Sequence, residues 1–189
     1  MDQSNIIYLP HKNLRSKSKK VGYVDDSIKK LAQNMQKATL SWESSRKHEV
    51  GVALAAVQVD ELKRIVIIRN NFEDKTDRTF KVFINPEIVK KDGEIIEDFE
   101  GCLSIKNIYG KVPRYNKVKI KALDLDGKPL RVTAEGFLAR VFQHEIDHTK
   151  GVVFIDHIKD NPEAFFTLKS DGSLEKLNYE SVRKDSLLW

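Results

Sequence analysis

The residues Gln143 to His148, QHEIDH, constrain the fold of this chain more than any other stretch. On a helix His144 and His148 lie one turn apart, so both imidazoles leave the same face, as two ligands of one divalent metal must. Glu145 then projects beside the metal and is suited to act as a general base toward water. The same string also arises by chance on amphipathic helices, so a metal site requires a third ligand elsewhere.

A helix is predicted around this string, with Thr133 as its N-cap and Gly151 as its terminator. Four of its side chains fall at helical spacing and form one stripe: Phe137, Val141, His144 and His148. The stripe is predicted to face the core, where a pair of imidazoles is costly unless its polar atoms are satisfied. Burial of two histidines beside Glu145 therefore favours a metal site.

Length and composition exclude several classes of protein. The 189 residues fit one domain, 1–189, with a substantial core. No apolar run approaches the ~20 residues that cross a bilayer, and the N-terminus lacks a secretion signal, so we expect a soluble protein that is not secreted. Cys102 is the single cysteine, which excludes an internal disulfide and suits a reducing compartment. The net charge of +5 could favour an anionic partner such as a ribosome, but it is too diffuse to indicate nucleic-acid recognition.

Hydrophobic periodicity predicts an amphipathic helix from Asp25 to about Leu40. Short strands and hairpins are predicted elsewhere: Arg64–Arg69, Thr79–Ile84 ended by Pro86, Ile95–Ile96, Val118–Leu123 with Leu130–Val132, Val152–Ile155, and a hairpin within Phe166–Leu177. These patterns predict an α+β fold in which short antiparallel β-sheets wrap around the central helix that carries HExxH.

The segment Gly51 to Val59, GVALAAVQV, is rich in small residues, which let backbones or a substrate approach closely. Gln58 is the one polar side chain within it. If Gln58 is buried, its amide either bonds to the backbone or faces a site. Composition alone leaves both readings open and favours the structural one.

Three stretches in chain order resemble the motifs of the peptide deformylase family: GVALAAVQ at 51–58, EGCLS at 100–104, and QHEIDH at 143–148. VPR at 112–114 and LDLDGKP at 123–129 are also similar to the family, so the likeness covers about residues 6–157 and leaves a hairpin and tail at 158–189. The resemblance implies one α+β catalytic domain. It also implies a metal-dependent hydrolase that removes the formyl group from N-formylmethionyl nascent peptides and releases formate. Such an enzyme is expected in a bacterial-type cytoplasm or, as the alternative, in an organelle.

The resemblance further implies the roles of individual residues. One divalent metal, Fe²⁺ first and Zn²⁺, Ni²⁺ or Co²⁺ as substitutes, would have three protein ligands: Cys102, His144 and His148. Glu145 would be the general base and then the acid. Gln58 and the backbone N–H of Leu103 would stabilise the oxyanion.

The substrate side of the site departs from the family pattern. Val52 and Val141 are expected to line the pocket for the methionine side chain. Ala53 stands where the family has its second glycine, beside the bound peptide, so its methyl group is expected to crowd the substrate or shift its strand-like pairing. Lys106 and Thr149 replace a common proline and a common leucine. These departures bear on rate and preference, not on the class of reaction.

Two other functions fit part of the pattern. A zinc endopeptidase of the HExxH kind usually takes its third ligand downstream of the helix, whereas here the thiolate lies upstream and His157 is poorly spaced. A binding module without activity would be compatible with Ala53. The intact Cys102, Glu145 and both histidines argue against that second alternative.

Overall fold

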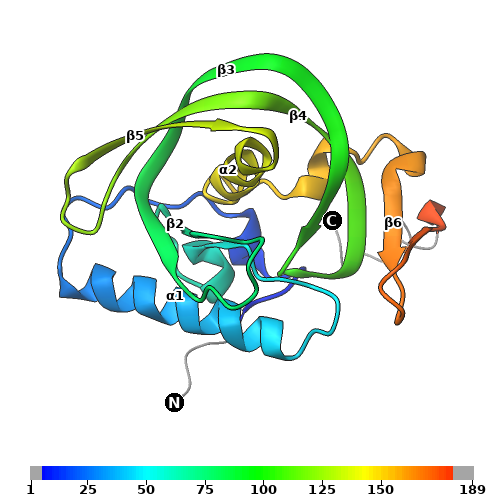
Figure 1. Ribbon diagram of the computed structural model, residues 1–189, viewed down its shortest axis with the longest axis horizontal. Helices are drawn as coiled ribbons and strands as arrows, with labels where there is room; N and C mark the ends of the chain where they lie inside the picture. The colour runs from blue at the N-terminus through cyan, green and yellow to red at the C-terminus, as the bar shows by residue number, and fades with distance from the viewer. Residues whose placement is uncertain (1–5, 181–189) are drawn as a thin grey trace.

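The computed structural model describes residues 6–180, with the N-terminal segment, two helices and seven strands shown in Figure 1. The helices and strands follow in this order: α1 (Asp26–Ser44), β1 (Ala53–Ala55), β2 (Ile65–Arg69), β3 (Phe80–Cys102), β4 (Ile105–Leu123), β5 (Pro129–Glu135), α2 (Gly136–His148), β6 (Phe165–Leu168) and β7 (Leu174–Lys176). Short 3₁₀ turns also occur: η1 (Lys12–Arg15), η2 (Ala56–Val59), η3 (Phe154–His157) and η4 (Pro162–Ala164).

The strands form one antiparallel sheet with the order β1-β2-β3-β4-β6-β7, and β5 pairs with β4. The long strands β3 and β4 arch over α2, while α1 lies on the other side of the molecule (Figure 1). The predicted α+β fold with a central HExxH helix is thus confirmed. The two central strands are much longer than the sequence pattern suggested, at 23 and 19 residues.

Pro86 does not end a strand, so that prediction was wrong. Strand β3 continues through it, because the register with β4 shifts between Ile84 and Glu87 and Asn85 takes a left-handed φ of 52°. Bulges of this kind accept a proline and increase the bend of a strand. The predicted short strand at Ile95 and Ile96 is part of the same β3.

Helix α1 follows its predicted amphipathic pattern. The side chain of Asp25 caps it by accepting a hydrogen bond of 3.0 Å from the Ile28 amide. The predicted stripe is buried: Ile28, Leu31, Met35 and Ala38. The helix runs beyond the predicted end at Leu40 as far as Ser44.

Helix α2 begins later than expected, since its N-cap is Glu135 and not Thr133. Thr133 lies in β5, paired with Lys119, and Gly136 with a φ of 58° lets the strand turn directly into the helix. The last helical residue is His148, and Gly151, predicted as the terminator, follows with a φ of 77°.

The prediction of a strand at Val152–Ile155 was wrong. The chain forms the 3₁₀ turn η3 there, capped by a hydrogen bond of 2.9 Å from the Val153 amide to Asp156. Phe154 and Ile155 are buried, so this apolar run reflects burial and not pairing. The hairpin predicted within Phe166–Leu177 is confirmed as β6 and β7. Leu187, Leu188 and Trp189, which the sequence pattern did not place, lie outside the described residues.

Two apolar clusters hold the layers together. One packs the inner face of the sheet against α2 and includes Ala53, Val118 and Phe142. The other packs the opposite side of β1 and β2 against α1 and includes Leu54 and Met35. The strand β1 thus contributes alternate residues to both clusters, which fixes its position beside α2. Within residues 6–180, no helix is long and apolar enough to cross a membrane.

Candidate metal centre

Three metal-binding side chains converge where β3 ends against α2. His144 and His148 lie one turn apart on α2, with ring centroids 5.0 Å apart, and Cys102 is the last residue of β3. Their ligand atoms all lie within 4.8 Å of one another, and the Cys102 sulfur is 3.3 Å from His148 Nε2. All three residues are buried. The fold therefore forms a Cys-His-His metal site from segments far apart in the sequence.

The donor set suits a divalent transition metal. A thiolate and two neutral imidazoles are ligands that iron, zinc, nickel and cobalt share. The Nδ1 atom of His144 is bound by Glu100 at 2.9 Å, which leaves Nε2 of this ring for a metal. A thiol and two imidazoles buried with their ligand atoms within 4.8 Å of one another form a donor set that fits a cation between them.

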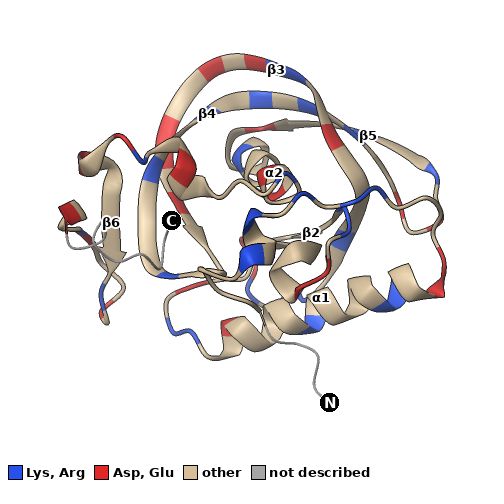
Figure 2. Cartoon of the chain, turned by 180° about the vertical axis from the view of Figure 1, so that it is seen from behind, with Lys and Arg blue, Asp and Glu red and all other residues tan. Residues whose placement is uncertain are grey.

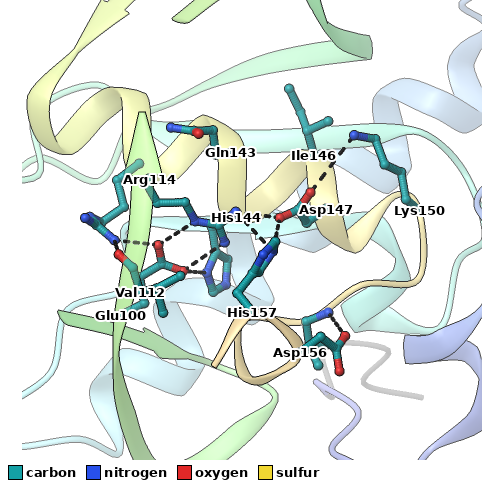
Figure 3. Close-up of polar contacts among 12 residues, drawn as sticks. Glu100, Val112, Arg114, Gln143, His144, Ile146, Asp147, Lys150, Asp156 and His157 are labelled. Atoms are coloured by element: carbon teal, nitrogen blue, oxygen red, sulfur yellow. Dashed lines mark hydrogen bonds and ion pairs between the residues drawn. The ribbon is translucent and has the colours of Figure 1, made fainter. Parts of the chain in front are cut away.

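Glu100 holds the metal-binding His144 in place and is itself held by two arginines, of which Figure 3 labels Arg114. Arg114 donates to both of its carboxylate oxygens at 2.8 and 3.1 Å, and Arg140 donates at 2.8 Å. Burial opposes the charged carboxylate, but hydrogen bonds from His144 and Arg114 hold the pKa of Glu100 well below its usual range. A carboxylate bound to the second nitrogen of a ligating histidine fixes the orientation of that ring.

Sequence reasoning assigned no role to Glu100, Arg114 or Arg140. The available signal was the presence of Glu100 in EGCLS and of Arg114 in VPR, two of the stretches that resemble the family. Arg140 carried no such signal. A charged residue in the first turns of a helix predicts a solvent-exposed side chain, whereas Arg140 is buried and bonds the Val112 carbonyl at 2.7 Å.

The same network continues to Asp147 and His157. Asp147 accepts hydrogen bonds from Arg114 at 2.6 Å and from His157 at 2.8 Å. Burial opposes its charge, but the hydrogen bond from His157 and the charge of Arg114 lower the pKa of Asp147 to about 2. His157 thus supports the network, and it is not one of the three convergent metal-binding residues, in keeping with its poor spacing in the sequence. This argues against the endopeptidase alternative, which usually takes its third ligand downstream of the helix.

Glu145 lies next to His144 and is buried, with 5% of its surface exposed. It lines the cavity above the metal-binding residues. Burial raises the pKa of Glu145 to about 7, a shift that the charge of His144 opposes and that of Glu100 supports. A carboxyl group with such a pKa exchanges a proton close to neutral pH.

Gln58 fulfils both alternatives that the sequence left open: its side-chain amide bonds to the backbone and also faces the site. Its side-chain oxygen accepts a hydrogen bond of 2.9 Å from the Ala55 amide, which fixes the orientation of the group. Its nitrogen donates to the Ser104 hydroxyl at 3.1 Å and lies 3.5 Å from the Cys102 sulfur. The buried amide is therefore tied to the backbone and also presents its donor side to the metal site.

The cavity over this site has a volume of about 210 Å³. Most of the predicted site residues line it: Val52, Ala53, Gln58, Cys102, Leu103, Val141, His144 and Glu145. His148 lies behind Cys102 and is fully buried. Phe137, predicted as part of the buried stripe of α2, is instead 47% exposed and lies at the edge of the cavity, so that prediction was wrong.

Comparisons with known proteins agree with this geometry. The family model described as polypeptide deformylase matches residues 3–163. A peptide deformylase of Chromobacterium violaceum is 42% identical over 154 residues, covering 82% of this chain and 86% of that protein. Peptide deformylase 1 of Pseudomonas syringae is 42% identical over 173 residues, covering 92% and 93%.

Solved structures lead to the same family. The crystal structure of a peptide deformylase from Synechococcus elongatus, in complex with actinonin, superimposes with a TM-score of 0.75 at 34% sequence identity, and the match covers 83% of this chain and 81% of that one. The sequence match, the shared fold and the Cys-His-His site agree with one another. Together they establish that this chain belongs to the peptide deformylase family of metal-dependent hydrolases, which remove the N-formyl group from nascent peptides.

Proposed function

We propose that this deformylase uses Glu145 as its proton-transfer group at a divalent metal held by Cys102, His144 and His148. The observation that carries the proposal is the placement of the buried Glu145 carboxyl group on the cavity side of the three convergent ligands. When bound, the metal supplies Lewis acidity and lowers the pKa of water. Glu145 accepts the proton released from water and later delivers it to the departing amine.

Two donors are positioned to stabilise the negative charge that develops on the formyl oxygen. The Gln58 side-chain nitrogen is oriented by the Ala55 amide and by Ser104. The second donor is the backbone N–H of Leu103, the residue after Cys102. Donors fixed before the reaction need no reorganisation during it, which is the main advantage of such a pair.

The overall reaction balances as a hydrolysis. A bond forms between the water oxygen and the formyl carbon, and the bond between that carbon and the amide nitrogen breaks. One proton of water passes through Glu145 to the nitrogen. The other proton of water stays on the formic acid, which ionises to formate, and the second product is a peptide with a free N-terminal amine.

The substrate is an N-formylmethionyl peptide, and we assign its methionine side chain to the apolar surface of Val52 and Val141. Ala53 lies in β1, which pairs with β2 alone among the described strands. The other edge of β1 is suited to pair with an extended peptide, as exposed strand edges do. The Ala53 methyl group is 4% exposed and belongs to the core cluster under α2, so it takes space inside the protein as well as beside the substrate.

We propose Fe²⁺ as the metal, with Zn²⁺, Ni²⁺ or Co²⁺ as substitutes. The donor set supports a divalent transition metal of this group. Metal analysis of protein purified without oxygen tests the assignment. We expect one iron per chain in the native protein, and a Cys102→Ser variant with much less.

We further propose a single catalytic domain that acts on nascent chains at the ribosome surface in a bacterial cytoplasm. One sheet contains both the strands that carry the motifs and the C-terminal hairpin, which supports a single domain. The net charge of +5 and the exposed lysines of β4 support an anionic partner; Figure 2 shows the basic positions of β4 in blue. Co-sedimentation with bacterial ribosomes at low and high salt tests the partner.

The experiment that tests the activity is formate release from formyl-Met-Ala-Ser by protein loaded with Fe²⁺ in the absence of oxygen. We expect rapid turnover that a chelator abolishes and that added Fe²⁺ restores. Protein with one metal per chain and no formate release would overturn the proposed function.

A further inference from the structure

The residues that line the cavity divide into a buried floor and a more exposed rim. The floor has exposed fractions of 8% or less and includes Gln58, Val141 and Glu145. The rim includes Phe99 and Tyr109, which are half-buried and lie at the ends of β3 and β4 nearest the site. Ligand pockets usually measure roughly 300–1,000 Å³, so about 210 Å³ suffices for one side chain and its formyl group. The residues that follow formyl-methionine must therefore lie along the rim.

The C-terminal hairpin of β6 and β7 pairs with the part of β4 that carries the rim residue Tyr109. Strand β6 pairs with β4 so that Phe166 lies opposite Tyr109, and on the other side Tyr109 lies opposite Gly101. Residues directly opposite each other in antiparallel strands point to the same face of the sheet. Phe166 and Tyr109 therefore share one face with Phe99, which lies two residues before Gly101.

On that face Phe166 contacts the cavity-lining Phe99. The two rings meet edge to face with centroids 4.9 Å apart. The Lys111 ammonium group lies over both rings, 5.3 Å from Phe99 and 5.8 Å from Phe166. Such aromatic and cation–π contacts restrict the positions available to each ring. The position of the Phe99 ring is therefore restricted by Phe166 of the hairpin and by Lys111.

The hairpin is in turn anchored to the body of the protein. Phe165 is fully buried, and Gly110, which pairs with it, lies so close to Ile158 and Phe154 that a β-carbon there would collide with both. Tyr109 itself is fixed by a hydrogen bond of 2.9 Å from its hydroxyl to Glu49. The rim on this side is thus a rigid layer of β3, β4 and β6.

We infer that the β6–β7 hairpin positions the aromatic rim formed by Phe99 and Tyr109, and that it thereby sets the affinity for the peptide residues after formyl-methionine. The inference rests on the proposed function and deepens it. It assigns a role to a segment that begins after residue 163, where the match to the family model ends. Phe166 is a positioning residue, since it does not line the cavity itself and contacts or pairs with the two rim residues that do.

The test compares Phe166→Ala with Leu168→Ala in the iron-loaded enzyme. Leu168 lies two residues further along the same face of β6 and pairs with Leu174, so its truncation is a matched change away from Phe99. The substrates are formyl-Met-Ala-Ser, which reaches the rim, and formylmethionine, which does not. For Phe166→Ala we expect KM for the tripeptide to rise about three- to tenfold, the equivalent of one aromatic pair, with kcat nearly unchanged.

Kinetic constants for formylmethionine are expected to stay at wild-type values in both variants, and Phe166→Tyr, which keeps the ring, is expected to keep the wild-type KM for the tripeptide. An equal rise in KM for Phe166→Ala and Leu168→Ala would overturn the inference, as would an equal effect on both substrates. Wild-type protein that fails with both substrates would overturn the proposed function instead.

Hydrogen exchange tests, without a measurement of turnover, whether Phe166 restrains the end of β3 that carries Phe99. In the metal-loaded protein we expect faster exchange of the amides of residues 97–101 in Phe166→Ala and unchanged exchange there in Leu168→Ala. If the exchange rates in Phe166→Ala match those of the wild type, the hairpin does not support the rim and the inference is wrong.

Discussion

Glu145 is the residue whose replacement separates catalysis from metal binding, because it lies beside the ligands without being one of the three. Glu145→Gln keeps the shape of the side chain and removes its ability to accept a proton. We expect formate release to fall by about 10²- to 10⁴-fold, the usual contribution of a positioned general base, with one metal still bound per chain. Parallel formate assays and metal analysis check this. Near wild-type turnover would show that another group transfers the proton.

Glu100 orients a ligand, so its replacement is expected to act on the metal. Glu100→Gln weakens the bond to His144 Nδ1, removes the carboxylate partner of Arg140 and leaves Arg114 paired with Asp147 alone. Loss of such a partner typically costs about 10- to 100-fold in metal affinity, which competition with a chelator measures. Glu97→Gln, an exposed change on the same strand, is the control. Equal affinity in the two variants would remove Glu100 from this role.

At the scale of single residues, the sequence predicted the candidate metal ligands and Gln58. It did not predict the residues that orient the ligands: Glu100, Arg114 and Arg140. The two histidines needed only the geometry of one helix, and Gln58 was the single polar group in an apolar segment. Arg140 could not be found in this way, since its burial depends on Glu100 arriving from β3. A charge in a helix is expected at the surface unless a partner is already known.

Among the secondary structure elements, α1 has a boundary that depends on one side chain. Asp25 caps it by accepting the Ile28 amide. Asp25→Ala removes this acceptor, so we expect a melting temperature lower by roughly 2–4 °C in thermal denaturation. Asp25→Asn keeps a capping oxygen and is expected to melt close to the wild type. If both variants lose the same amount, the capping bond is not the source of the effect.

The strands were the least predictable elements. Local patterns suggested several short strands, since turn residues such as Pro86 and Gly93 interrupt the alternation of β3. In the structure, register shifts against β4 absorb these residues and leave one bent strand of 23 residues. A bulge is a property of two paired strands, so the sequence of one of them does not reveal it.

At the scale of the whole molecule, Glu87 of β3 forms ion pairs with basic residues from three other segments of the chain. Its carboxylate lies 2.7 Å from Lys20 in the N-terminal segment and 2.9 Å from Lys121 in β4, and Arg64, just before β2, is 3.9 Å away. Hydrogen bonds from Lys20 and Lys121 lower the pKa of Glu87 from its ordinary 4.5 to about 2. The folded state thus favours the charged form, and this stabilisation is present above pH 4.5 and is lost as the pH falls toward 2.

Glu87→Gln is therefore expected to lower the free energy of unfolding at pH 7 by about 0.2–1 kcal/mol, the range for partly exposed ion pairs. The difference from the wild type is expected to shrink as the pH falls below 4.5. Urea denaturation of both proteins in metal-free form at several pH values measures it. A difference that stays constant between pH 7 and the acid range would contradict the assignment.

The sequence alone was enough to predict the chemistry of this protein: two histidines and a glutamate on one helix, a single cysteine, one amide side chain in an apolar segment, and three motifs that resemble those of the deformylase family. These features are local, because helical spacing alone places His144 and His148 on one face. Only the tertiary structure decided that β3 ends against that helix, that Glu100 is held by two arginines, and that Phe166 supports Phe99. Such contacts depend on strand register and on burial between distant segments, which no local pattern encodes.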